Sequence, residues 1–536
     1  MKNLVRIPVF ISIALLVSSC GFQGGESGRR AARTKFAISY PESANTGPIT
    51  GRAYVMISET DEREPRLQIG TGGVPFFGLD VEQLRPGEEA EIDGDIFGYP
   101  VENLEDLPPG DYYVQAFVNV YTEFNRSDGH TLWMHQDQWE GQHWNRSPGN
   151  LYSDVMRVHI DPSQRETIDL VCGNVIPPVT IPDDTEWVKR IKFQSEILTE
   201  FWGVPQYLGA TILLPRGYAQ ETNRRYPVNY IQGHFSLRAP NGFTEEPGNE
   251  FFDFWNSGNA PRMIAVTFQH PAPHYDDSYA MNSPNVGPYG DAIMQELIPY
   301  IEENFRIISE PYARVLSGGS TGGWISLAMQ ILYPDFFGGV FSNCPDPVDF
   351  NYFQAVNIYD DENAYYKTRG WLKVPTASDR TTDGITTLTY KQRNHYELAA
   401  GTKGRSGGQI DIFEAAFGPI GEDGYVKPLF DKYTGVIDPE VAEYWREHSD
   451  LNHILQRDYA EIGPKLRGKL HIYTGDMDTH YLNPAVVLME EFLENTENPY
   501  YDGVVEYGDG APHCWGPRGA DLVRMMAQHV QQASRR

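Results

Sequence analysis

Apolar and polar positions follow different patterns in the two parts of the chain. From about residue 208 onward, short apolar runs such as residues 263–268 and 339–342 have the length and composition of buried strands. Between them, the apolar positions of residues 291–305 recur at helical spacing. Strands that alternate with helices predict a parallel sheet covered by helices, so we expect a doubly wound α/β domain over residues 188–536.

The first part of the chain predicts strands without intervening helices. These strands are expected at residues 51–58, 111–121, 155–160 and 167–171. Short strands with turn signals between them predict an all-β sandwich of the immunoglobulin-like type over residues 34–172. Residues 126–150 between them are expected to be a long polar loop. The proline-rich stretch 173–187 is typical of a stiff interdomain linker.

The alternation of strands and helices is interrupted once. It stops at Asn343 and resumes at residue 469, so residues of about 345–465, which show no regular strand pattern, form an insertion in the α/β domain. Long insertions in compact domains are usually functional. This one leaves the sheet at the carboxyl end of a strand, where doubly wound sheets bind ligands. We therefore expect a lid over that edge of the sheet.

The charge and the histidine pattern limit the partners. The formal net charge is −30, with acidic residues spread along the chain, so phosphate backbones would be repelled and we expect no nucleic-acid partner. His130, His135 and His143 are neighbours in sequence, but their spacing fits no known metal cluster, and the chain has no Cys-x-x-Cys pair. We expect no metal and no cofactor, with a metal at these histidines as the alternative.

The N-terminus has the features of an export signal. Basic residues precede an apolar run over residues 7–17 that is too short to cross a membrane. The sequence Val17-Ser18-Ser19-Cys20 resembles the lipobox of bacterial lipoproteins. That resemblance implies a signal peptide over residues 1–19, lipidation of Cys20 and a tether over residues 20–33. Glycine rather than aspartate after the cysteine is similar to outer-membrane lipoproteins, so we expect an exported, lipid-anchored protein there.

One glycine-rich turn carries the strongest chemical signal. Gly318, Ser320 and Gly322 satisfy G-x-S-x-G between an expected strand and an expected helix. In this setting the turn is a nucleophile elbow, which projects the serine hydroxyl above the sheet. Ser317 lacks the pattern, because Val315 stands where a small residue is needed. Ser320 is therefore the candidate nucleophile.

A serine nucleophile needs a base for its proton and an acid that orients the base. His513 follows the last expected strand in a loop bounded by glycine and proline, so it is the candidate base, with His480 as the alternative. The acid should follow the preceding strand. A G-x-x-D pattern, common there in related hydrolases, favours Asp478, and Asp476 remains open. The order Ser320, Asp478, His513 is that of α/β-hydrolases.

Backbone N–H groups must also stabilise the oxyanion. One is expected from Thr321, the residue after the nucleophile. The second is expected from the loop after residues 228–231, where His234 or Phe235 would donate. Many hydrolases have His-Gly in this loop, and the glutamine at position 232 leaves the second donor open.

These segments resemble a known family. The runs YPVNYIQGHF, GDAIMQELIPYIEENFRI and RVLSGGSTGGWISLAMQILYPDFFGGVFS are similar to the putative-esterase family of esterase D, enterochelin esterases, feruloyl esterases and mycolyltransferases. The resemblance is strong over residues 188–345 and weaker over 465–535. Enterochelin esterases and some feruloyl esterases also carry a β-sandwich before the hydrolase domain. The resemblance implies an α/β-hydrolase that cleaves a carboxylic ester.

The sequence leaves related functions open. The same residues would serve an acyltransferase or a serine peptidase, and a broken triad would leave a non-catalytic glycan-binding lipoprotein. We expect the ester hydrolase, because each member of the triad is present in its expected context. Surface lipoproteins of this type often serve glycan uptake, so an acylated or feruloylated carbohydrate is the expected substrate.

Aromatic residues of the insertion and two cysteines are also expected near the active site. Aromatic residues of the insertion suit sugars or phenolic groups, although more than half should form its own core: Tyr352, Phe353, Tyr359, Tyr365, Tyr366, Trp371, Tyr444 and Trp445. Substitutions at Trp371 or Trp445 are expected to affect bulky esters more than small ones. Cys344 and Cys514 are expected at the active-site edge of the sheet, as a disulfide or as two thiols.

Overall fold

The computed structural model describes residues 34–141, 143–275 and 278–535. All of them belong to one compact unit that begins at Ala32. The expected signal peptide, the tether and Cys20 lie outside the described residues. Within the described part of the chain, no helix combines the length and the apolar character needed to span a bilayer.

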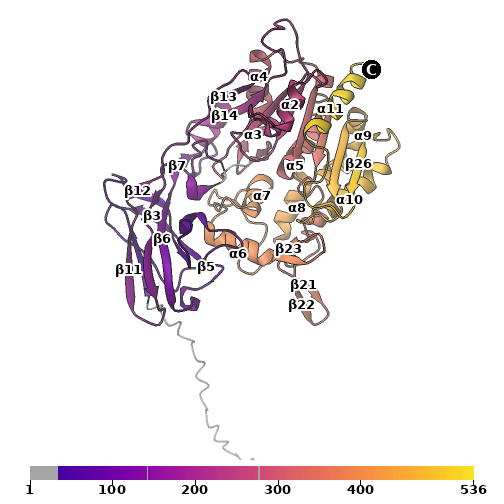
Figure 1. The fold of residues 1–536 in the computed structure, drawn as a ribbon. Helices are drawn as coiled ribbons and strands as arrows, with labels where there is room; N and C mark the ends of the chain where they lie inside the picture. Colours follow the sequence, from indigo (N-terminus) through magenta and orange to yellow (C-terminus); the bar gives the residue numbers. More distant parts are fainter. Residues whose placement is uncertain (1–33, 142, 276–277, 536) are drawn as a thin grey trace, which may run out of the picture. The chain divides into compact units, whose positions relative to one another are not determined.

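Two sheets form the N-terminal sandwich (Figure 1). The smaller has the order β11-β1-β4, and the larger has the order β12-β9-β6-β2-β3-β5, with β10 paired to β6. Their facing side chains, such as Ile38, Val55 and Val114, are fully buried and form the sandwich core. The bounds are β1 Thr34–Ser39, β2 Ile49–Ser58, β3 Phe76–Leu84, β4 Ala90–Ile92, β5 Gly98–Tyr99, β6 Gly110–Val120, β9 Leu151–Tyr152, β10 Met156–Ile160, β11 Glu166–Val171 and β12 Asn174–Val175.

The larger sheet of the sandwich is covered on its other face as well. Every residue of β2 is buried, because this face packs against helix α6 (Tyr390–Ala400) of the insertion. The Tyr54 hydroxyl donates to the Ala400 carbonyl oxygen. Asp80 accepts bonds from Arg52 at 2.7 Å and from Arg405 at 2.9 Å, which neutralises charges buried at this contact. The sandwich therefore supports the insertion.

The segment over residues 126–150 is more ordered than the expected polar loop. It contains strand β8 (Thr131–Met134), which pairs with β7 (Thr122–Asn125), and a short 3-10 helix, Trp144–Arg146. Phe124, Leu132 and Met134 form a small apolar cluster with Trp202. The loop expectation is wrong because these buried apolar positions are few and are separated by polar ones.

An eight-stranded sheet forms the second part, in the order β13-β14-β16-β15-β19-β20-β25-β26. The six strands from β16 to β26 in this order are parallel to one another. Strands β13 and β14 add antiparallel pairs at one edge. This is the α/β-hydrolase fold, as expected. The bounds are β13 Val188–Ser195, β14 Gln206–Leu213, β15 Val228–Gln232, β16 Ile264–Gln269, β19 Arg314–Gly319, β20 Gly339–Asn343, β25 Leu470–Gly475 and β26 Val504–Gly508.

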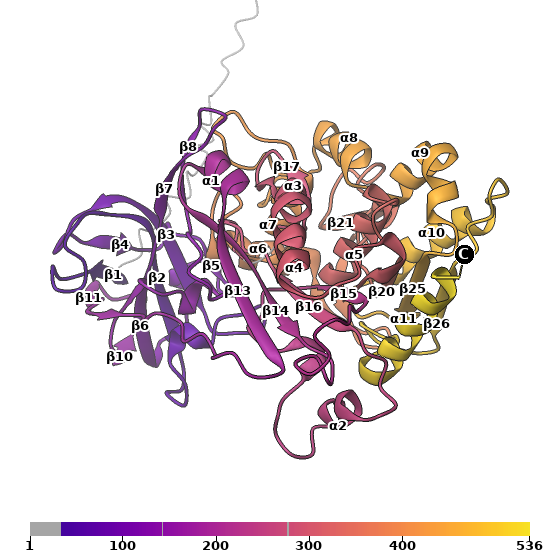
Figure 2. The same cartoon turned by 90° about the horizontal axis from the view of Figure 1, so that it is seen from above.

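Helices cover both faces of this sheet (Figure 2). Leu316 of β19 packs into the cluster that contains α5, whereas its neighbour Val315 packs into the cluster that contains α11. Adjacent residues of one strand are thus buried on opposite faces, as in parallel sheets. The helix bounds are α1 Glu196–Trp202, α2 Glu250–Asn256, α3 Tyr289–Ala292, a π-helical turn Ile293–Leu297, α4 Ile298–Asn304, α5 Thr321–Leu332, α9 Leu451–Leu466, α10 Asn483–Glu494 and α11 Gly519–Ala533.

The insertion contains helices and two hairpins, although no strand was expected in it. The hairpins pair β21 (Tyr366–Arg369) with β22 (Leu372–Pro375) and β23 (Ala377–Arg380) with β24 (Thr386–Thr389). Every residue of β22 is exposed, so the buried pattern that predicts a strand is missing there. Helices α6, α7 (Gln409–Phe417) and α8 (Pro439–His448) also belong to the insertion, and α9 spans its expected end.

Candidate active site

Ser320 stands at a sharp turn between β19 and α5. Its φ of 57° is rare for a residue with a side chain, and such strain is typical of functional positions. A Cβ on Gly318 would lie 2.2 Å from the Gly322 carbonyl oxygen, and one on Gly322 would lie 2.1 Å from the Gln232 carbonyl oxygen. Both positions of the motif therefore require glycine. The backbone of this turn has the form of a nucleophile elbow.

The three residues expected to form a triad meet at this turn. His513 Nε2 lies 2.9 Å from Ser320 Oγ, and His513 Nδ1 lies 2.7 Å from Asp478 Oδ2. Asp478 follows β25 and His513 follows β26, so both side chains come from the carboxyl end of the sheet. Asp478 is fully buried, and its Oδ1 also accepts a bond from the His480 backbone N–H at 2.8 Å. The two bonds hold the carboxylate in one orientation.

The alternatives for base and acid have other partners. His480 Nδ1 lies 3.0 Å from Asp379 of the insertion. The Asp476 backbone N–H donates to the Gly508 carbonyl oxygen at 3.0 Å, and its own carbonyl oxygen accepts from Asn483. The geometry thus pairs His513 with Asp478, while Asp476 links the loop to neighbouring segments through its backbone.

Hydrogen bonds decide the pKa of His513. Burial of the imidazole lowers it, but the hydrogen bonds with Asp478 and Cys514 outweigh this effect and raise the pKa above its ordinary value. The Asp478 carboxylate therefore favours the protonated form of the imidazole.

Two cysteines lie beside the turn that carries Ser320. Cys344 Sγ accepts a bond from the Ser320 backbone N–H at 3.3 Å and lies 2.6 Å from Cys514 Sγ. Cys344 follows β20 and Cys514 follows His513 directly, so the contact links the loops after β20 and β26. Both lie at the active-site edge, as expected.

The residues expected to form the oxyanion hole lie at the same edge. Thr321 is the first residue of α5, and its side chain donates to Asp346 at 2.9 Å. His234 and Phe235 follow β15, whose last residue is aligned with Gly318 of β19. The Phe235 ring meets the Trp139 ring of the N-terminal part at 5.2 Å.

Sequence reasoning missed a buried acidic group beside the nucleophile. Asp346 Oδ1 lies 3.4 Å from Ser320 Oγ, and its Oδ2 accepts a bond from the Tyr279 hydroxyl at 2.7 Å. Burial raises the pKa of this carboxyl group. Gln409 of α7 in turn donates to Tyr279 at 2.7 Å. The one available signal was the position of Asp346 directly after a strand at the carboxyl edge.

The insertion contacts the loop after β25 that carries Asp478, at the edge of the sheet where a lid was expected. Arg380 donates to the carbonyl oxygen of Asp478 at 2.9 Å, and Asp379 holds His480. Its aromatic residues divide between core and surface: Trp445 is fully buried, whereas Trp371 is fully exposed. Trp445 packs against Phe350 and Phe353 inside the insertion, so it is one of the aromatic residues that form its core, as expected for most of them.

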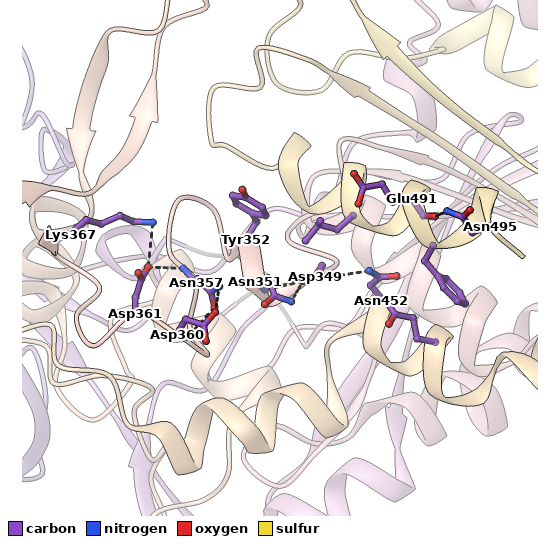
Figure 3. Close-up of a pocket in the computed structure, with 13 residues that line it drawn as sticks. Asp349, Asn351, Tyr352, Asn357, Asp360, Asp361, Lys367, Asn452, Glu491 and Asn495 are labelled. Atoms are coloured by element: carbon purple, nitrogen blue, oxygen red, sulfur yellow. Dashed lines mark hydrogen bonds and ion pairs between the residues drawn. The ribbon is translucent and has the colours of Figure 1, made fainter. Parts of the chain in front are cut away.

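Two cavities lie outside this cluster. A polar one of about 880 Å³ is lined by Asp349, Asn351, Asn357 and Asn452 among others, and carries no member of the expected triad (Figure 3). A second one, of about 1230 Å³, is bounded by Trp139, Phe235 and Phe243. Phe235, one of the two candidate second oxyanion donors, lines this cavity, whereas no member of the expected triad does.

The three histidines of the expected metal alternative have separate surroundings. His135 Nε2 lies 2.6 Å from Glu140, and these two residues with Asp137 are close enough to share an ion. Within the described ranges, neither His130 nor His143 belongs to this group. His130 instead lies 3.2 Å from Asp128.

One protein-family model matches part of this chain. The model described as "Putative esterase" matches residues 204–394, which include β15, β19, Ser320 and the start of the insertion. The matched segment therefore resembles this esterase family. The match supports an esterase, an enzyme of carboxylic-ester hydrolysis, on the α/β-hydrolase fold.

The solved structures that match this chain are distant in sequence. A ferulic acid esterase is 14% identical with a TM-score of 0.36, covering 65% of this chain and 98% of that one. An S-formylglutathione hydrolase from Agrobacterium tumefaciens is 14% identical with a TM-score of 0.37, covering 66% and 98%. A CE1 ferulic acid esterase from Anaeromyces mucronatus is 15% identical with a TM-score of 0.29, covering 65% and 93%. No curated protein matches the chain.

Proposed function

We propose that Ser320, His513 and Asp478 are the catalytic triad of this esterase. The observation that carries the proposal is the continuous contact from Asp478 through His513 to Ser320 Oγ, at 2.7 and 2.9 Å. His513 takes the Ser320 proton as Oγ attacks the ester carbonyl carbon, and then gives it to the leaving alcohol. Water, deprotonated by the same base, releases the acid from the acyl-enzyme.

The oxyanion of each tetrahedral intermediate is held by backbone N–H groups in this proposal. Thr321 supplies one, because it begins α5 directly after the nucleophile. His234 or Phe235 supplies the other, from the loop after β15, which is aligned with the elbow strand. Such donors act without reorganisation when charge develops on the carbonyl oxygen, which is why their loss is costly.

An active-site probe tests the triad. A fluorophosphonate should label the wild-type protein at Ser320, and peptide mass spectrometry should locate the adduct. Ser320→Ala should remove the labelling. Labelling that persists in this variant, or an adduct on another residue, contradicts the proposal.

The substrate that we propose is an acylated or feruloylated carbohydrate. The cavity next to Phe235 supports it, because Trp139, Phe235 and Phe243 offer aromatic side chains at a site large enough for several sugar rings. A panel of acetyl, feruloyl and longer acyl esters, on sugars and on simple alcohols, tests the proposal. A preference for simple alcohol esters would contradict it.

The export proposal rests on the sequence alone. We propose that the chain is secreted and anchored by lipid at Cys20 in the outer membrane, because residues 1–20 carry the export and lipobox features. Metabolic labelling with a fatty acid should mark the protein and should be lost in Cys20→Ser. Labelling that is equal in the two forms contradicts the anchor.

A further inference from the structure

Two carboxylate groups lie on different sides of the Ser320 hydroxyl. On one side His513 connects Ser320 to Asp478. On the other, Asp346 lies with its Oδ1 3.4 Å from Ser320 Oγ and is only 4% exposed. The proposed reaction uses the first carboxylate and leaves the second without a role.

The hydrogen bonds around Asp346 determine which of its oxygens is available. The Gln409 amide can only donate through Nε2, so the Tyr279 hydroxyl accepts from it at 2.7 Å and donates its own proton to Asp346 Oδ2 at 2.7 Å. Thr321 Oγ1 donates to the same oxygen at 2.9 Å. Two donors therefore occupy Oδ2, while Oδ1 is directed at the nucleophile.

Oδ1 has only a weak partner in the described part of the chain. Its bond with Ser320 Oγ is long, at 3.4 Å, whereas the same hydroxyl lies 2.9 Å from His513 Nε2, which must receive its proton. During the reaction Ser320 Oγ becomes bonded to the acyl carbon and has no proton to offer. A buried carboxylate oxygen without a donor is unfavourable, so the reacting complex needs a donor from elsewhere.

The negative charge of Asp346 makes the need for a hydrogen-bond donor to Oδ1 stronger. A carboxylate beside the reacting carbon repels the developing oxyanion and any acidic substituent of the substrate. For an ester of a plain acid and a plain alcohol, the group would only slow the reaction. For a substrate that carries a hydroxyl group beside the ester, the same oxygen provides a charged acceptor, which makes stronger hydrogen bonds than a neutral one.

We propose that Asp346 Oδ1 accepts a hydrogen bond from a substrate hydroxyl group that neighbours the scissile ester, and that the enzyme thereby selects hydroxylated esters. The inference rests on the proposed triad. The hydroxyl belongs either to the alcohol part, as in a partly acylated sugar, or to the acyl part, as in a hydroxy acid. In both cases Asp346 is a specificity residue, held in place by the insertion through Gln409 and Tyr279.

The contacts of α7 explain how the insertion reaches this position. Gln409 is the first residue of α7, and Phe417 at the other end of this helix packs against Trp324 of α5 with ring centroids 4.8 Å apart. The helix that follows the nucleophile and the helix that orients Asp346 are thus packed together, so the insertion contributes to the wall of the site.

Matched esters test the inference with the wild-type enzyme. One arm compares 2-hydroxycyclohexyl acetate with its 2-methoxy and unsubstituted analogues, and the other compares phenyl lactate with phenyl propionate. We expect kcat/KM to favour the hydroxylated member of one arm by about 10- to 100-fold, the usual range for a hydrogen bond to a charged group. The favoured arm identifies the part that carries the hydroxyl. No preference in either arm overturns the inference, whatever any variant does.

Asp346→Asn then separates recognition from a structural role. It should bring the preference close to unity, mainly through a higher KM for the hydroxylated ester, because the charged acceptor is lost. An equal loss on both esters would indicate a purely structural role and would overturn the inference. Asp349→Asn is the matched control: this buried carboxylate of the same loop bonds Asn351 and Asn452 instead, and its replacement should leave the preference intact.

The two proposals fail in different ways. If the esters are hydrolysed and Ser320 is labelled but no hydroxyl preference exists, the triad stands and the role of Asp346 is refuted. If no ester is hydrolysed and the fluorophosphonate does not react at Ser320, the triad proposal is refuted, and this inference with it.

Discussion

The two sides of Ser320 are built by different means. The His513 side consists of loops that follow adjacent parallel strands, β25 and β26, and its atoms are fixed by the register of one sheet. The Asp346 side combines a loop after β20 with Tyr279 and with Gln409 of the insertion. The first side lies on loops that follow neighbouring strands of one sheet, whereas the second also depends on a helix of the insertion.

Because of this difference, we expect the His513 side to serve the reaction and the Asp346 side to serve the choice of substrate. A sheet brings the same strand ends together whatever is inserted between them, so a triad placed there tolerates a long insertion. The opposite side depends partly on the insertion, because Gln409 of α7 donates to the Tyr279 hydroxyl, which in turn donates to Asp346. We therefore expect substitutions on the His513 side to abolish turnover and those on the Asp346 side to change which ester is cleaved.

The largest expected effect is the loss of the nucleophile. Ser320→Ala should lower kcat by about 10⁶-fold and His513→Ala by about 10⁴-fold or more, as for other triads. Steady-state hydrolysis of a phenyl ester measures both. Ser317→Ala is the control, since this buried hydroxyl donates to Asn229 at 3.0 Å and lies one strand position from the motif. A comparable loss in the control would attribute the effect to the strand and its packing.

The acid on the His513 side should show the next largest effect. Asp478→Asn removes the acceptor that holds the His513 tautomer and should lower kcat by about 10⁴-fold. Asp476→Asn should cost less than about tenfold, because the contacts of Asp476 to Gly508 and Asn483 are made by its backbone. The two variants should be compared at equal folded fraction. A reversed ranking would transfer the role of the acid to Asp476.

Local signals made the His513 side predictable from the sequence. Ser320, Asp478 and His513 each follow an apolar run that predicts a strand, and the glycines of the elbow identify the turn. The Asp346 side has no such signal. Its contacts join residues that are 67 and 130 positions apart, and a single aspartate, tyrosine or glutamine in a loop is ordinary. Patterns along the chain carry no information on which of these residues meet.

The same limit applies to the rest of the fold. Four strands of the sandwich, β2, β6, β10 and β11, could be predicted because their apolar runs are clear, whereas the others were not expected. The parallel strands of the larger sheet could be predicted for the same reason, but its edge strand β13 was not expected. The support that the sandwich gives to the insertion could not, because it depends on contacts such as Tyr54 with Ala400 and Arg405 with Asp80, which join residues 346 and 325 positions apart. The exposed hairpin β21–β22 was missed since it buries no side chain that would produce a strand pattern.

Two tryptophans separate packing from recognition within the insertion. Trp445→Ala should destabilise the fold by about 3–5 kcal/mol, because a fully buried ring leaves a cavity between Phe350 and Phe353. Trp371→Ala should change stability by less than about 0.5 kcal/mol, since its side chain is fully exposed. Chemical denaturation of both variants measures this. A small effect for Trp445 would mean that the insertion folds without its aromatic core.

The pH profile should show the smallest effect and compares the two carboxylates directly. His513 must be neutral to accept the Ser320 proton, so kcat/KM should rise with pH through the pKa of His513. Burial lowers this pKa, but the bonds with Asp478 and Cys514 raise it by more, so the acidic limb of the pH profile should lie above the ordinary histidine value of about 6.5.

Removing a negative charge near His513 makes the imidazolium less stable and moves the acidic limb to lower pH. Asp478 bonds His513 directly, whereas Asp346 acts on it only through space. The shift should therefore be larger in the residual activity of Asp478→Asn than in Asp346→Asn. A larger shift in Asp346→Asn would mean that this carboxylate is the stronger electrostatic partner of the base, and that the two sides of Ser320 share the chemistry.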